Sequence, residues 1–460
     1  MNEPSAEHEA EVSSSGKSDP AIPAQIGVNG VQWASGAPWQ SPLTLEESRR
    51  LIEEHSHPPP DRMNLADSGE DLSEAGWGVV YGPDVDGATK EALRPLLELR
   101  RTQAGGDEGL FSEMQVQDGE SAEDFLARQG GDGDWADPQI APTFLLMVGR
   151  NIPFELQTSF PLPYNVGRLS LTSPEEYAAY AQAAADAELS PQLRPRRVAL
   201  AGTDGGEDSR FPLMTEDLME SVERSIALAR PSWDAITLTQ GLTTQRRLAQ
   251  LLADSSETPA VLVTAGRSVC AAGNGRLFDL VGALVCCDYS GGELNPEHVF
   301  DAGKVSQDAR LNGLMVLLQG SFTAGRPAHP LLDRLRGRPA GETVEATLPR
   351  RLLGRKSGPA LAVLGHCECC WLHLAARSQR EEWAGFMTSF LEGLLQRQSV
   401  GAALQDYRRR CCQLADRLEN EPNANAEKQF QRRLEAWALR QEARNWILMG
   451  DPAGRLPVAL

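Results

Sequence analysis

The chain has 460 residues, 41% of them hydrophobic, and a formal net charge of −20 at pH 7. This length suffices for two or three domains, and the negative charge argues against nucleic acid and anionic membrane as partners, because phosphate binding needs clustered Lys and Arg. No run of about 18 apolar residues predicts a membrane span. The start, MNEPSAEHEAEVSSSGKSDP, lacks the regions of a secretory signal peptide, so we expect a cytoplasmic protein whose eight Cys stay reduced.

Residues 1–60 are predicted to be a disordered acidic tail and linker. They are rich in Ser, Pro, Glu and Gly, and they end in the run HSHPPPD. One short apolar stretch, GVNGVQW, lies inside this region and is a candidate to dock on a later domain.

Residues 61–193 are predicted to form an N-terminal α/β subdomain. GWGVVYG, TFLLMVG and YNVGRLSL read as short strands, of which the first two are continuous apolar runs bounded by Gly. TKEALRPLLELRRTQ has helical periodicity, although Pro95 lies within it. SPEEYAAYAQAAADAE begins with Ser173 as a helix N-cap and Pro174 in the first turn.

Residues 194–376 alternate strand and helix signals. The predicted strands lie near 198–201, 235–239, 261–265, 315–319 and 360–364, with helical patterns such as DLMESVERSIALA and TTQRRLAQLLAD between them. This alternation predicts a mainly parallel sheet with helices on both faces, in which functional groups gather beyond the carboxyl ends of the strands. Residues 377–460 are predicted to be a helical segment that packs on this sheet, because apolar residues recur at a spacing of three and four.

Five segments, in this order and spacing, resemble a bacterial branch of the gingipain-like cysteine peptidases. They are FLLMVGRNIPF with YNVGRLSLTSPEEY, PAVLVTAGRSV with GALVCCDYSG, RLNGLMVLLQGSFTAGRP, LPRRLLGRKSGPALAVLGHCECCW, and RNWILMGDPAGRLPV. The resemblance runs from about residue 75 to the end of the chain. It implies a caspase-like α/β fold: a mainly parallel sheet with helices on both faces, preceded by a smaller α/β subdomain and followed by C-terminal helices.

The resemblance also implies a Cys–His dyad, in which a thiolate attacks the peptide carbonyl and an imidazole acts as acid and base. The segment that should carry the His reads TAGRS here, with Arg267 in place of the His. The segment that should carry the Cys reads GSFTAG, with Ser321 in place of the Cys. Arg stays protonated at physiological pH and cannot act as a general base, and the Ser hydroxyl needs such a base to attack.

Two other arrangements are open at the same edge of the sheet. His366 ends a predicted strand, and Cys270 lies three residues after Arg267, so a displaced Cys270–His366 dyad is conceivable. The run HCECC followed by His373 offers soft metal ligands, but structural zinc sites usually draw on two separated ligand pairs. The acidic loop TDGGEDS is better explained as a solvated turn than as a calcium site. We therefore expect no metal and no cofactor.

The sequence supports two hypotheses of function. In the first, the chain is a gingipain-like pseudopeptidase that binds a peptide or protein partner, and its negative charge would suit a basic partner. In the second, it is an active cysteine endopeptidase with a displaced dyad. Whether the chain is an enzyme stays open at this point, because fold resemblance does not establish function.

Overall fold

The computed structural model describes most of the chain beyond residue 69 and two short pieces before it. The described residues are 31–32, 43–54, 70–106, 109–131, 137–191, 193–203, 210–239, 241–253, 258–271, 278–371, 377–421 and 425–458. His373 and residues 204–209 of the acidic loop lie outside them, as does most of the predicted tail. None of the helices in these ranges combines the length and the apolar character needed to cross a membrane.

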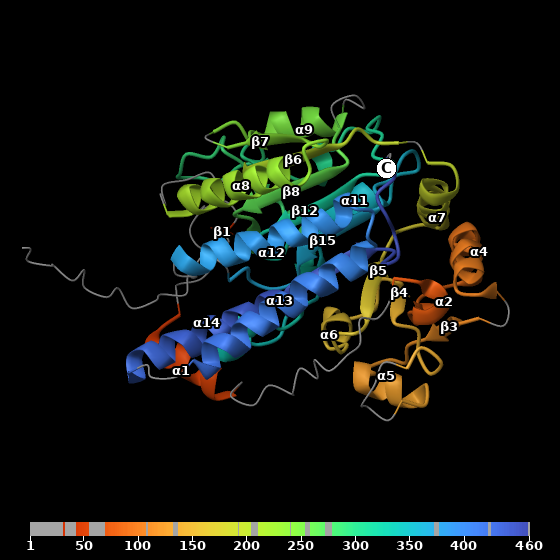
Figure 1. The fold of residues 1–460 in the computed structure, drawn as a ribbon, viewed down its shortest axis with the longest axis horizontal. Coiled ribbons are helices and arrows are strands. Elements are labelled where there is room, and N and C mark those ends of the chain that lie inside the picture. The colour runs from red at the N-terminus through yellow and green to blue at the C-terminus, as the bar shows by residue number, and fades with distance from the viewer. Residues whose placement is uncertain are drawn as a thin grey trace, which may run out of the picture.

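A ten-stranded sheet forms the centre of the molecule (Figure 1). Its strands, in spatial order, are β3 (Phe111–Gln115), β2 (Trp77–Tyr81), β4 (Phe144–Val148), β5 (Asn165–Leu169), β16 (Trp446–Gly450), β15 (Ala362–His366), β12 (Met315–Gln319), β8 (Val261–Gly266), β6 (Arg197–Thr203) and β7 (Asp234–Leu238). Neighbouring strands are parallel except for the antiparallel pair β15–β16. The two halves of the sheet therefore run in opposite directions and meet at β16.

Helices cover the sheet, and several are long enough to cross it. They are α1 (Leu45–Glu54), α2 (Leu72–Ala75), α3 (Gly87–Ala92), α4 (Arg94–Gln103), α5 (Ala122–Arg128), α6 (Phe154–Thr158), α7 (Pro174–Leu189), α8 (Arg210–Ala229), α9 (Gln245–Ala253), α10 (Leu331–Leu335), α11 (Thr347–Leu353), α12 (Arg377–Leu395), α13 (Val400–Asn420) and α14 (Ala426–Asn445). Figure 1 shows α8, α12, α13 and α14 side by side in front of the sheet.

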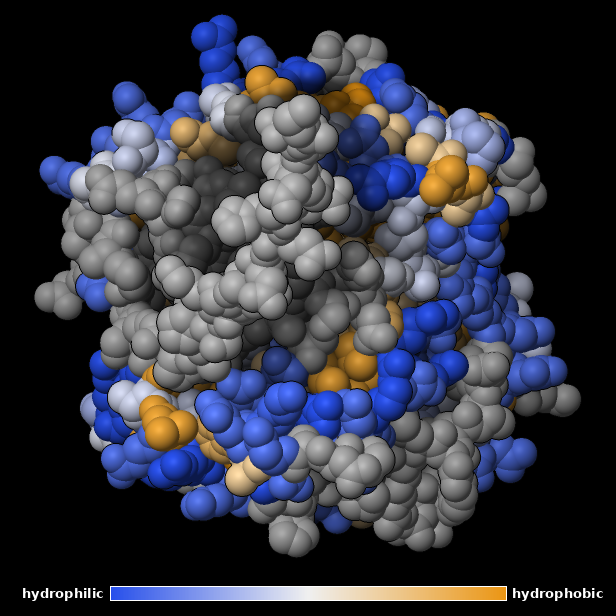
Figure 2. All heavy atoms as spheres, turned by 60° about the vertical axis from the view of Figure 1, so that its left-hand side comes forward, coloured by the Kyte–Doolittle hydropathy of each residue, from blue (hydrophilic) through white to orange (hydrophobic). Residues whose placement is uncertain are grey.

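Short strands outside the sheet pair two by two. They are β1 (Val31–Gln32) with β9 (Val269–Ala271), β10 (Leu284–Val285) with β11 (Val299–Phe300), and β13 (Gly325–Arg326) with β14 (Val344–Glu345). On the face shown in Figure 2, the described surface is mostly hydrophilic and its hydrophobic residues form small separate spots.

The structure confirms the predicted fold class. The five strands expected between residues 194 and 376 are β6, β7, β8, β12 and β15, although β15 begins at Ala362, two residues later than expected. Strands β2, β4, β5, β8, β12 and β15 are buried along their whole length. Burial on both faces of a parallel sheet explains why most of their sequences are largely continuous apolar runs rather than alternating patterns. Strand β5 is the exception, with Asn165 and Arg168 among its buried residues.

The single helix expected over TKEALRPLLELRRTQ is instead two helices. The chain leaves α3 at Leu93 and starts α4 at Arg94, with Pro95 in the first turn of α4. Pro has no backbone N–H and its ring clashes with the preceding turn, so a helix tolerates it only at the beginning.

The predicted tail is not uniformly without structure. Thr44 and Glu47 form a reciprocal capping box, with Thr44 N donating to Glu47 Oε2 (2.7 Å) and Glu47 N donating to Thr44 Oγ1 (3.1 Å), and α1 follows. Leu51 of α1 is fully buried. The stretch GVNGVQW also docks, since its Val31–Gln32 pair runs parallel to β9. The prediction of a disordered segment was therefore wrong for these pieces, because a cap and an apolar face outweigh the acidic composition.

The C-terminal segment, expected to be helical, also supplies a strand. After α14 the chain enters β16, whose five residues are all buried and join the two halves of the sheet. Strand β16 is thus part of the core.

Candidate active site

Three neighbouring strands bring the predicted site residues to one edge of the sheet. Gln319 of β12 lies beside Ala265 of β8, and Arg267 and Ser321 each follow two residues later. His366 is the last residue of β15, which is parallel to β12 on its other side. Carboxyl ends of parallel strands share an edge, so the strand order places all three residues at the same end of this half of the sheet.

The turns that carry Arg267 and Ser321 are in direct contact. The Ser268 hydroxyl donates a hydrogen bond to the carbonyl oxygen of Ser321. Arg267 is 8% exposed and Ser321 is completely buried. The two turns are therefore packed together, and the hydroxyl of Ser321 is shielded from solvent.

The turn after β12 has a strained backbone conformation. Phe322, fully buried, has a φ of 59°, a region that bulky side chains rarely adopt. The Thr323 hydroxyl donates to Leu318 O (2.7 Å) and to Gly320 O (3.0 Å), and its oxygen accepts from the backbone N–H of His366 (3.0 Å). These bonds fix the turn against β15.

Ser321 has a structural partner. Its hydroxyl oxygen accepts a hydrogen bond from the backbone N–H of Cys370 at 3.0 Å. The atom at the expected nucleophile position therefore holds the HCECC segment in place, rather than being directed at an open cleft.

Cys270, the predicted alternative nucleophile, belongs to an apolar cluster. Its Sγ donates to Ser268 O (3.5 Å), and its side chain is fully buried with Leu51, Phe322 and Trp371 among the neighbours of the cluster. The thiol grouped with His366 is a different one.

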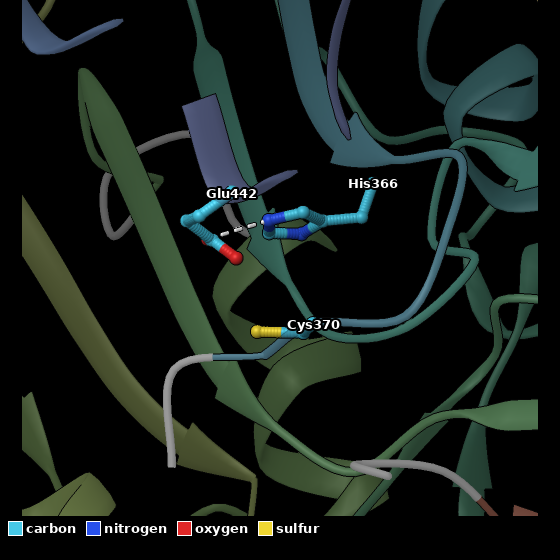
Figure 3. A group of neighbouring side chains, drawn as sticks. All are labelled: His366, Cys370 and Glu442. Atoms are coloured by element: carbon cyan, nitrogen blue, oxygen red, sulfur yellow. Dashed lines mark hydrogen bonds and ion pairs between the residues drawn. The ribbon is translucent and has the colours of Figure 1, made fainter. Parts of the chain in front are cut away.

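His366 forms a compact polar cluster with Cys370 and Glu442 (Figure 3). A hydrogen bond of 2.7 Å joins His366 Nε2 and Glu442 Oε1. One ring nitrogen of His366, the Cys370 sulfur and one Glu442 carboxylate oxygen all lie within 4.8 Å of one another. His366 and Glu442 are completely buried, and Cys370 is 2% exposed. The arrangement is chemically suited to hold a proton or a metal ion, but not to receive a peptide as it stands.

No sequence pattern points to Glu442. It lies on α14, 76 residues from His366, in a helix that also contains Glu427 and Glu435. Cys370 is visible in the HCECC run, but its pairing with His366 depends on the bend of the chain after β15. Only the return of α14 into β16 brings the carboxylate to the imidazole.

Burial disfavours the thiolate form of several thiols near this cluster. It raises the pKa of Cys367, Cys369 and Cys411 well above the usual value of a thiol. A thiol needs positive neighbours or partial exposure to form the nucleophilic thiolate. Burial likewise raises the pKa of Glu368 to about 8, while one of its oxygens accepts from Leu331 N at 2.9 Å.

The Gly-Asp-Pro ending forms a second buried polar cluster, centred on Asp451. This carboxylate accepts from Trp77 Nε1 (3.0 Å) and from Arg100 Nε (2.7 Å). Arg100 also forms an ion pair of 2.6 Å with Glu188, and the Tyr180 hydroxyl accepts from Asp451 N at 2.7 Å. The cluster ties β16 to the N-terminal half of the sheet.

Comparisons with known proteins found a likeness in fold but none in sequence. No protein-family model and no curated sequence match the chain. A solved structure described as "Structure of Protease" superposes with a TM-score of 0.50 at 12% identity, over 83% of this chain and 78% of that one. A complex of the pro- and mature domains of Porphyromonas gingivalis RgpB, a gingipain, gives a TM-score of 0.46 at 11% identity, over 83% and 80%. The chain therefore shares its fold with a solved protease structure.

Proposed function

We propose that the chain is a catalytically silent pseudopeptidase that keeps the gingipain-like fold as a module for binding a peptide or protein. One observation carries the proposal: the hydroxyl at the expected nucleophile position, Ser321, is completely buried and accepts a hydrogen bond from Cys370 N. The expected base position holds Arg267, which cannot take a proton.

The loss of the base alone predicts a large loss of rate. Proton transfer by a positioned side chain contributes a factor of about 10² to 10⁴. Ser321 would also need its hydroxyl exposed to a substrate carbonyl, and the packing of the two turns prevents this.

Binding of an extended partner is supported by the edge beside the site. β9 begins two residues after Arg267, and the short strand β1 runs parallel to it. Because β1 and residues 282–284 already pair with β9, a partner segment would take the place of β1, and main-chain hydrogen bonds would provide its affinity. The net charge of −20 favours a basic partner over an acidic one or a nucleic acid.

Three measurements test the proposal. Purified protein should give no turnover of a broad peptide library and no labelling by a thiol-directed peptide probe. On a peptide array, basic peptides should bind more tightly than acidic peptides, with an affinity that falls as the salt concentration rises. Turnover that disappears in Ser321→Ala would overturn the proposal that the chain is a pseudopeptidase.

A second candidate is an active cysteine peptidase that uses Cys370, His366 and Glu442. The hydrogen bond between His366 and Glu442 favours it, since a carboxylate orients the imidazole in many nucleophile–base–acid sets. Complete burial of the base weighs against it. Turnover that is lost in Cys370→Ala, but kept in Ser321→Ala and Cys270→Ala, would establish this candidate instead.

A further inference from the structure

We propose that His366, Cys370 and Glu442 form a binding site for one divalent metal ion of the zinc class. This inference is independent of the proposed function and would hold whether or not the protein cleaves peptides. Imidazole, thiolate and carboxylate are the three ligand types that zinc takes in proteins. Calcium and magnesium, which prefer oxygen ligands only, do not fit a set with one nitrogen and one sulfur.

The polar atoms of the cluster are incompletely satisfied. In the part of the chain that the structure describes, Glu442 Oε2 is buried and has no hydrogen-bond partner, and an ion bound between Nε2 of His366 and this carboxylate would provide one. Nearly all buried polar atoms in native proteins have a partner, and exceptions need an explanation such as an ion. Figure 3 shows the Cys370 sulfur and the Glu442 carboxylate lying on the same side of the imidazole, so the three side chains converge on one space.

The distances are compatible with a site that tightens around an ion. Zinc lies about 2.0 to 2.3 Å from its N, O and S ligands, so tetrahedral ligands stand roughly 3.3 to 3.8 Å apart. The His366–Glu442 pair, at 2.7 Å, would open slightly, and the widest pair, at up to 4.8 Å, would close by about 1 Å. A zinc ion would replace the proton between imidazole and carboxylate, and a water would complete the four ligands.

Rigid elements hold each ligand in place. The backbone of His366 is fixed by Thr323, and its ring packs against the Trp446 ring with centroids 4.1 Å apart. The backbone N–H of Cys370 is bound by Ser321. Glu442 lies in the last turn of α14, directly before β16. Side chains whose supports are already ordered lose little freedom on binding an ion.

The position of the site gives the ion a structural role. It joins β15 and the loop after it to the end of α14, with 76 residues between His366 and Glu442. Because metal ligands rarely assemble in an unfolded chain, binding energy at such a site becomes folding stability. A bound ion would also hold the Cys370 sulfur as a ligand.

Cobalt(II) is the direct probe, since it substitutes for zinc and gives a sulfur-to-metal charge-transfer band only when a thiolate binds. The full chain would be stripped with a chelator and titrated with Co²⁺, then with Zn²⁺ in competition. We expect one ion per chain, a charge-transfer band, and displacement by zinc. Glu442→Gln and Cys370→Ser should each weaken binding by more than the roughly 10- to 100-fold that loss of a supporting residue costs.

Cys367→Ala is the matched control, because Cys367 is a buried thiol of the same HCECC run outside the cluster. It should bind cobalt as the wild type does. Wild type that binds no cobalt, or binding equal in wild type and Glu442→Gln, would overturn the proposal. So would equal losses in Cys367→Ala and Cys370→Ser, which would point to an unspecific thiol cluster. Circular dichroism of Glu442→Gln, whose side chain keeps its size, separates loss of the site from loss of the fold.

Discussion

Strand β16 has a buried polar cluster at each end. The two clusters differ in how many of their buried polar atoms have a hydrogen-bond partner. Just after the strand, Asp451 accepts hydrogen bonds from Trp77 and Arg100, and Arg100 is also paired with Glu188. Just before the strand, Glu442 has one hydrogen bond, to His366, and its Oε2 has no partner among the described residues.

This difference separates a structural role from a binding role. A buried charge that is neutralised and fully hydrogen-bonded holds two elements in one arrangement. A buried carboxyl group that has an unused acceptor oxygen next to an imidazole and a thiol can bind a metal ion without losing an existing partner. We therefore expect the Asp451 cluster to dominate stability, and the His366 cluster to contribute little until an ion is bound.

The largest effect is expected for Asp451→Ala. The substitution leaves Arg100, itself 1% exposed, with one carboxylate instead of two, and leaves Trp77 Nε1 without an acceptor. Removal of one partner of a buried pair costs about 3 to 5 kcal/mol. Urea unfolding followed by tryptophan fluorescence measures the loss.

Glu91→Ala is the control for this change. Glu91 pairs with Arg94 at 2.8 Å on the surface, where both side chains are more than 60% exposed. Exposed pairs contribute about 0 to 1 kcal/mol. Equal losses in the two variants would contradict the view that the Asp451 cluster holds the two halves of the sheet together.

Glu368 offers an intermediate case, a half-buried residue whose carboxyl oxygen Oε2 is buried and has no hydrogen-bond partner in the described structure. Burial raises its pKa to about 8 in the folded protein, above the ordinary 4.5. The folded state therefore binds a proton that the unfolded state releases. This contribution to stability is fully present below about pH 4.5 and is lost as pH rises to about 8, with a slope of at most about 1.4 kcal/mol per pH unit.

Glu368→Gln isolates this contribution. Its amide oxygen can accept from Leu331 N as the carboxyl group does, but it does not titrate. Unfolding free energies of wild type and variant should diverge as pH rises from 5 toward about 8, with the wild type falling relative to the variant. A difference that stays constant with pH would show that Glu368 has an ordinary pKa.

The sequence predicts the central sheet well because both faces of its strands are buried. Continuous apolar runs such as FLLMV and MVLLQ have few alternatives to a strand inside an α/β sheet. The edge where Arg267, Ser321 and His366 meet also follows from strand order, since parallel strands end together.

Features that depend on distant parts of the chain could not be predicted. Helix α1 is signalled locally by the Thr44–Glu47 capping box, but its burial depends on contact with α14. Glu442 resembles any exposed glutamate in sequence and becomes part of the site only because α14 leads into β16. Sequence gives the type of a side chain, whereas its role here depends on tertiary contacts.

A smaller effect is expected for Ser321→Ala. The change removes the acceptor of the Cys370 N–H, which is buried. A buried donor left without a partner costs about 1 to 3 kcal/mol. Ser306→Ala is the control, because Ser306 accepts from Asp308 N in an exposed turn where water can replace it. If thermal unfolding shows equal small losses, Ser321 does not support the HCECC segment.

The smallest effect is expected for Glu442→Gln in the presence of a chelator. The amide can still hydrogen-bond His366, and the substitution leaves no paired cation behind, because Glu442 has no Arg or Lys partner in the described structure. We expect the free energy of unfolding to change by no more than about 1 kcal/mol, the size of one exchanged hydrogen bond. Asp451→Asn, the same chemical change at the other end of β16, should cost clearly more because it leaves Arg100 short of negative charge. Urea unfolding of both variants side by side is the measurement. A loss in Glu442→Gln as large as that in Asp451→Asn would mean that both clusters are structural, and the contrast between the two ends of β16 would then be wrong.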